Sequence, residues 1–127
     1  MFKIRREQKE AFKAAAVHDF ETEMVRHIER CLPARHAELG EIVVRELIQQ
    51  GIERAAGHGI VSERGTCIYV HAMLVLGRDF EVDERYARTS AILKHPSLSE
   101  WTKAELLFDA IYDAPSPASG HVAEGVP

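Results

Sequence analysis

Residues 39–80 constrain the fold of this chain more than any other stretch. Two apolar segments lie within it, and each repeats its apolar residues at the three- and four-residue spacing of one helix face. The members are Val43, Val44, Leu47, Ile48 and Ile52 in the first segment, and Cys67, Ile68, Val70, Met73, Leu74 and Leu76 in the second. Gly57 and Gly59, between the segments, are typical of a turn that closes a helix. The stretch therefore predicts an antiparallel pair of helices, of which the second is the more deeply buried.

A long helix is predicted before this pair, from Arg5 to about Leu32. Its apolar residues recur every four positions, and no proline interrupts the run. These residues are Phe12, Ala16, Phe20, Met24 and Ile28. Pro33 then opens a connection over residues 33–40 with room for a short turn. We expect the helix pair to pack against this first helix.

Individual residues indicate where the two helices of the pair begin and end. The first helix of the pair is expected over Glu41–Ala56. Gly51 inside it is unfavourable for a helix, which indicates a close approach by another helix or a local kink. Ser62 is a good N-cap for the next helix, and Gly77 marks where that helix stops.

Two shorter helices are predicted after Gly77. One covers about Glu84–Lys94, and the other begins at Ser97 or Ser99, where the spacing of Ser97 and Glu100 resembles a capping box. Its inward face is expected to contain Trp101, Leu107 or Phe108, and Ile111.

The chain as a whole is predicted to be all-α, a single compact bundle of about five helices with a long first helix. Residues 1–113 are expected to form this helical domain. Residues 114–127 are rich in proline, glycine and small side chains, and we expect them to form a disordered tail.

Composition narrows the class of protein. The net charge of −4 argues against nucleic acid as a partner, because nucleic-acid-binding proteins usually carry a basic patch. No run approaches the roughly 20 apolar residues that a membrane span needs. The first residues, MFKIRREQ, lack the apolar core of a signal peptide, and there are only two cysteines. We therefore expect a cytoplasmic protein with reduced thiols.

A metal site is the sharpest chemical hypothesis that the residues allow. His27 and Cys31 are four residues apart on the first helix, and Cys67 and His71 are four apart on the third. Each pair shares a helix face, so two packed helices could present a Cys2His2 zinc site. The simpler interpretation makes Cys67 a core thiol and Cys31 a helix-end residue, which leaves no metal site. Neither cysteine has the local signature of a catalytic nucleophile.

Other catalytic motifs are absent from the sequence. Asp79, Glu81, Asp83 and Glu84 form an acidic run, but the ordered ligand pattern and internal glycine of an EF-hand are missing. There is no HExxH motif, nucleophile elbow or glycine-rich dinucleotide loop. We predict that the protein is not an enzyme and has no cofactor.

Two stretches are candidates for contact with a protein partner. Arg5, Arg6 and Lys9 could dock against an acidic surface, although a solvated helix face explains them more simply. Arg78, Asp79 and Phe80 could form a recognition loop, or a helix stop whose phenylalanine fills the core.

The number of aromatic residues also favours binding to a protein partner. A compact five-helix core does not need to hide all of them, so one or more is expected to be an exposed binding anchor. The candidates are Phe2, Phe12, Phe20, Tyr86, Trp101 and Tyr112. Binding a partner is therefore the favoured class of function, and homo-oligomerisation is compatible with it.

Several phrases of the sequence resemble a family of small helical bacterial proteins encoded among effector, adaptor and spike genes of type VI secretion systems. They are FKIRREQKEAF, LGEIVVRELIQQGIERAAGHGIVSER, LVLGRDF and AILKHPSLS, and they fall within residues 2–112. The most distinctive short segments are IRREQ, GIERA, HGI, SER and LGRDF.

This resemblance implies a cytoplasmic accessory role and no catalytic motif. The implied role is an adaptor or co-chaperone that binds a secreted effector, or the adaptor that loads it onto the secretion spike. An immunity protein that neutralises a cognate toxin is the alternative in the same gene setting, and a Cys/His metal-binding protein is a more distant one.

Overall fold

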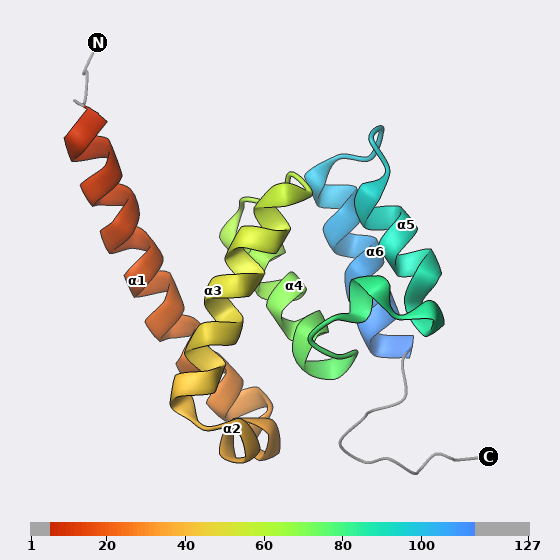
Figure 1. Cartoon of the computed structure of the whole chain (residues 1–127), viewed down its shortest axis with the longest axis horizontal. Helices are drawn as coiled ribbons and strands as arrows, with labels where there is room; N and C mark the ends of the chain where they lie inside the picture. The colour runs from red at the N-terminus through yellow and green to blue at the C-terminus, as the bar shows by residue number, and fades with distance from the viewer. Residues whose placement is uncertain (1–5, 114–127) are drawn as a thin grey trace.

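The structure, a computed structural model, describes residues 6–113, with the side chains of Ala16 and residues 18–112. This part of the chain is all-helical and contains no strand, which confirms the predicted fold class (Figure 1). The elements are α1 (Arg6–Cys31), α2 (Pro33–Leu39), α3 (Glu41–Gly57), α4 (Glu63–Val75), the 3₁₀ turns η1 (Phe80–Val82) and η2 (Glu84–Tyr86), α5 (Ala87–Lys94) and α6 (Glu100–Asp113). The predicted tail, residues 114–127, lies outside the described residues.

Helix α4 is the centre of the molecule. It runs antiparallel to α3 and lies between α3 and α6, which pack on different sides of it (Figure 1). Most of its side chains are buried, as the prediction of a buried second helix required: Thr66, Ile68, Tyr69, Val70, Ala72, Met73 and Leu74. The surrounding helices complete the core with Ile28, Val44, Ile48, Leu93 and Leu107, which are all fully buried.

Gly51 allows α3 and α4 to approach closely. A Cβ atom built at this glycine would lie 2.6 Å from Cγ2 of Val70 and 3.2 Å from Sδ of Met73. Any larger residue would push α4 away, so the unfavourable glycine inside α3 is explained by packing. This confirms the close approach that the sequence indicated.

The turn between α3 and α4 is closed by local hydrogen bonds. The N–H of Gly59 donates to the carbonyl of Ala56, and the N–H of Ile60 donates to that of Ala55, both at 2.9 Å. This pattern is the Schellman motif, and it needs a left-handed residue, which Gly59 supplies with φ +80°. Ser62 caps α4 as predicted, because its hydroxyl accepts from the N–H of Gly65 at 3.0 Å.

Two predicted boundaries and one predicted cap differ from the structure. Residues 33–39 form the helix α2, which begins with Pro33, a residue that fits the first turn of a helix. The helix expected from Glu84 starts with a 3₁₀ turn and becomes α-helical only at Ala87. Helix α6 starts after Ser99, one of the two expected positions, and the hydroxyl of Ser99 accepts from the N–H of Thr102 at 3.2 Å, so the capping box of Ser97 and Glu100 was wrong.

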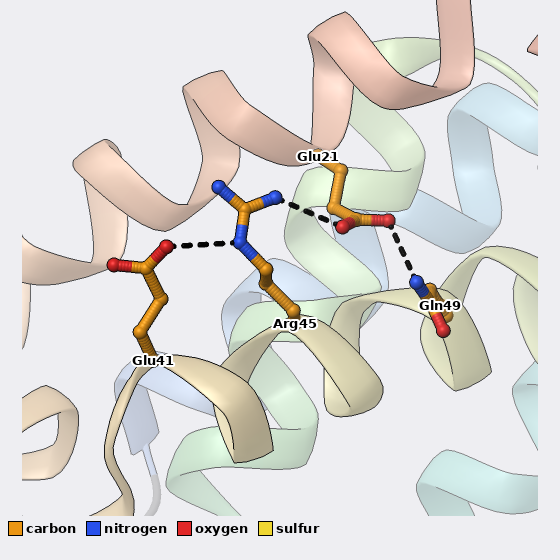
Figure 2. Close-up of polar contacts among 4 residues, drawn as sticks. All are labelled: Glu21, Glu41, Arg45 and Gln49. Atoms are coloured by element: carbon orange, nitrogen blue, oxygen red, sulfur yellow. Dashed lines mark hydrogen bonds and ion pairs between the residues drawn. The ribbon is translucent and has the colours of Figure 1, made fainter.

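Helix α1 is attached to the rest of the molecule over its second half. Figure 2 shows Glu21 of α1 held by α3, with Arg45 Nη1 donating to its Oε1 at 3.0 Å and Gln49 Nε2 to its Oε2 at 3.1 Å. Arg45 Nε also donates to Glu41 at 3.0 Å, and these two carboxylates raise the pKa of Arg45. The earlier turns of α1 extend away from the other helices (Figure 1). Within residues 6–113 there are six α-helices where about five were expected, because residues 33–39 form a helix of their own.

Candidate functional site

Helix α6 carries a row of exposed aromatic side chains on its outer side. Trp101 is 64% exposed, Phe108 39% and Tyr112 75%. The spacings of seven and four residues place all three on one helix face, since a helix repeats every 3.6 residues. The rings of Phe108 and Tyr112 are in contact, with centroids 4.9 Å apart. We call Trp101, Phe108 and Tyr112 the α6 aromatic face.

A charged side chain from α4 holds the amino end of this face in place. The Arg64 guanidinium carbon lies 4.8 Å from the centroid of the Trp101 ring, within the range of a cation–π contact. The Nη2 atom of Arg64 also pairs with Oε2 of Glu105 at 2.8 Å, and Glu105 lies one turn after Trp101 on the same helix. Trp101 is therefore oriented although it is exposed to solvent.

The sequence located this site only in part. The expectation that one or more of six named aromatics is exposed is confirmed for Trp101 and Tyr112, while Phe20 and Tyr86 are half-buried. Phe2 and the side chain of Phe12 lie outside the described part of the chain. Trp101 was also expected on the inward face of its helix, and this was wrong, because Leu107 and Ala104 fill that side. The spacing of positions 101, 105, 108 and 112 is the signal that would have found the whole face.

An apolar cleft lies between α1 and the turn that joins α3 to α4. Its volume is about 360 Å³. It is lined by Ala16, Phe20, Ile52, Ala56, Ile60, Val61, Glu63 and Thr66. A second hollow shares Phe20 and Glu63 with it and continues between α1 and α4, past Glu23 and Arg30. We call the first hollow the α1 cleft.

The predicted recognition loop is tied to the body of the molecule. Phe80 is buried in the core, so its side chain is inaccessible to a partner, and the helix-stop interpretation describes it correctly. Arg78 and Asp79 are exposed, but α3 holds both: Arg54 donates to the Arg78 carbonyl at 2.7 Å and pairs with Asp79 at 3.3 Å. Arg78 itself donates to Gln50 Oε1 at 3.0 Å. This loop is therefore shaped by α3.

A polar cluster that the sequence did not indicate lies beside this loop. Glu81 Oε1 is 2.7 Å from Nε2 of His58, and its other oxygen accepts from the hydroxyl of the buried Tyr69. These residues come from η1, the end of α3 and the middle of α4, so no local pattern in the sequence could bring them together. All of their bonds are internal, and we assign the cluster to holding η1 in place.

The four metal-ligand candidates lie where α1 passes α4. Sγ of Cys31 is 3.7 Å from Nδ1 of His27, and the ring of His27 is 6.1 Å from that of His71. Burial raises the pKa of the Cys67 thiol, with a smaller effect from Cys31, and burial beside His27 lowers the pKa of His71. Among the described residues, however, no group of three or more such side chains is arranged to hold a metal ion.

The side chains of the basic candidates at the amino end lie outside the part of the chain that the structure describes. Arg5 lies outside the described residues, and Arg6 and Lys9 belong to the first turns of α1, whose side chains are not described. Within residues 6–113, no helix is both long enough and apolar enough to cross a bilayer.

Comparison with protein-family models, with curated proteins and with solved structures finds no match for this chain.

Proposed function

We propose that this protein is a non-catalytic accessory protein of a type VI secretion effector cluster. In this proposal it acts in the cytoplasm as an adaptor or co-chaperone, and it binds a secreted effector or the adaptor that loads that effector. The gene setting comes from the resemblance of the sequence phrases described above. The single structural observation that supports binding is the α6 aromatic face.

Exposed aromatics of this kind are suited to protein recognition. Tryptophan, tyrosine and arginine are the residue types that most often dominate the energy of protein interfaces. Trp101 is already oriented by Arg64, which Glu105 holds in turn. Binding would therefore immobilise few additional side-chain torsions, and this reduces the entropic penalty of association.

The α6 aromatic face can be tested by paired substitutions. The combined change Trp101→Ala and Tyr112→Ala should weaken the affinity for the effector or its loading adaptor by about 30-fold or more, which corresponds to about 2 kcal/mol. Both side chains are exposed, so the fold should persist. The measurement is titration calorimetry with the partner that the full chain retains from the native host.

Ile42→Ala and Val82→Ala are the matched controls. Both residues are exposed apolar side chains, 77% and 82% exposed, and they belong to α3 and η1. Equal affinity for the α6 double variant and the wild-type chain would contradict the proposal.

The toxicity of the effector in the presence of this protein distinguishes an adaptor from an immunity protein. An adaptor leaves the toxicity of the effector intact when the two are co-expressed, and it joins a complex that contains the loading machinery. An immunity protein suppresses toxicity in proportion to its amount. Suppression of this kind would replace the adaptor role with the alternative that the gene setting also allows.

A further inference from the structure

The backbone of the first half of α1 extends away from the other helices (Figure 1). The helix begins at Arg6, and Glu21 is its first buried residue among those whose side chains are described. The residues just before Glu21 are exposed: Ala16, His18 and Asp19. Isolated helices of fewer than about 12–15 residues are marginal in water, because their stability depends on packing an apolar face. This half of α1 would therefore be stabilised by a surface that covers it.

The α1 cleft offers apolar surface beside the same turns. Ala16 and Phe20 form one wall, and Val61, which is 74% exposed, belongs to the other side. The adjoining hollow is lined by charged side chains of both signs, Glu23 and Glu63 together with three arginines. A complementary segment would carry apolar residues for the cleft and charged residues of both signs beyond them.

The sequence of α1 itself meets this requirement, and it does so symmetrically about Ala16. Phe12 and Phe20 are each four residues from Ala16, and Lys9 and Glu23 are each seven residues from it. At about 100° per residue, all five positions fall within about 40° of Ala16 around the helix. A two-fold axis at Ala16 would therefore set Phe12 of one copy opposite Phe20 of another, and Lys9 opposite Glu23.

This self-complementarity defines both the partner and the direction of pairing. An interface between identical copies across a two-fold axis requires that one patch complement itself. A parallel pair in register would place Lys9 beside Lys9 and Glu23 beside Glu23, and like charges in contact are unfavourable. The antiparallel pair replaces both repulsions with attractions, and the small side chain of Ala16 lets the helices come close at the crossing.

We propose that the protein forms a homodimer through antiparallel α1 helices that cross at Ala16. The first half of each α1 lies in the α1 cleft of the other copy, beside Phe20 and Val61. Each subunit thus covers the part of its neighbour that the isolated chain leaves open. The α6 aromatic face, on another helix, plays no part in this contact.

Sedimentation equilibrium of the full chain over a range of concentrations tests the dimer. The wild-type chain should show a reversible monomer–dimer equilibrium. Ala16→Glu places like charges on the axis and should raise the dissociation constant of the dimer by at least about tenfold, equivalent to about 1.4 kcal/mol. Ala91→Glu, at an exposed alanine of α5, is the control and should leave it unchanged. A chain that stays monomeric at every concentration overturns the proposal.

A charge exchange tests the antiparallel register independently of the fold. Lys9→Glu and Glu23→Lys should each weaken the dimer, and the two changes combined in one chain should restore it. Circular dichroism would check that each variant keeps its helical content. A dimer that responds to none of these changes forms through another surface and contradicts the assignment. None of these outcomes bears on the binding of an effector by α6.

Discussion

Glu100 lies in the first turn of α6, yet its carboxylate accepts hydrogen bonds from the backbone just before α4. Its Oε2 accepts from the N–H of Ser62 at 2.9 Å, and its Oε1 accepts from the N–H of Val61 at 3.2 Å. The Ser62 side chain contributes most to lowering the pKa of Glu100, followed by the two backbone N–H groups. The sequence suggested a local capping role instead, because it shows which residue can accept a hydrogen bond but not which helix end lies within reach.

The lowered pKa of Glu100 predicts a dependence of stability on pH. Because its pKa is lower in the folded chain, the ionised carboxylate stabilises the fold above its ordinary unfolded-state pKa of 4.5, and this contribution disappears as pH falls through the lowered value. Glu100→Gln should therefore melt below the wild type at pH 7, and the gap should close under acid conditions. Thermal unfolding by circular dichroism from pH 7 to pH 3 measures this difference in melting temperature.

Glu46→Gln is the control for this comparison, since Glu46 is an exposed carboxylate of α3. Its melting temperature should follow that of the wild type at every pH. A Glu100→Gln gap that stays constant down to pH 3 would show that the charge of Glu100 contributes nothing.

The 3₁₀ turn η1 is the element that depends most on distant partners. Its three residues are too few to be stable alone, and two of them anchor it. Phe80 is buried with its ring centroid 5.5 Å from that of Tyr69, and Glu81 is bound by Tyr69 and His58. The sequence predicted that Phe80 could fill the core, but the carboxylate anchor required α3 and α4 to be in place.

A double-mutant cycle can measure the Tyr69–Glu81 contact. Tyr69→Phe removes a hydrogen bond to a charged group and should lower the free energy of unfolding by about 1.5–3 kcal/mol. In a Glu81→Gln background the same change should have a smaller effect, because the two side chains are coupled. Urea unfolding gives the four values. Tyr86→Phe, at a half-buried tyrosine, is the control; additive effects would mean that Glu81 is not held by Tyr69 in solution.

At the scale of the whole molecule, packing is dense around α4, whereas the backbone of the first half of α1 extends away from the other helices (Figure 1). Amides in well-packed elements open only with global unfolding, whereas those with few buried neighbours open locally. Among the described helices, hydrogen exchange should therefore be slowest in α4 and fastest in residues 6–19 of α1. The proposed dimer adds a concentration dependence, because a second copy would cover those turns and slow their exchange.

Exchange measured by mass spectrometry at two protein concentrations checks both statements. Protection within α4 should not change with concentration, which makes it the internal reference. If residues 6–19 were as protected as α4 in dilute solution, the expectation that these turns open locally would be wrong.

The sequence by itself determined where the helices lie and where several of them end. Helical periodicity and caps such as Ser62 and Gly59 act between residues a few positions apart, so they can be recognised without a structure. Only the tertiary structure decided which faces meet. The exposure of Trp101, the partner of Glu100 and the projection of α1 depend on residues far apart in the chain, whose contacts form only after the helices pack. An apolar stripe in the sequence predicts that a helix face is buried, but it does not predict which surface packs against that face.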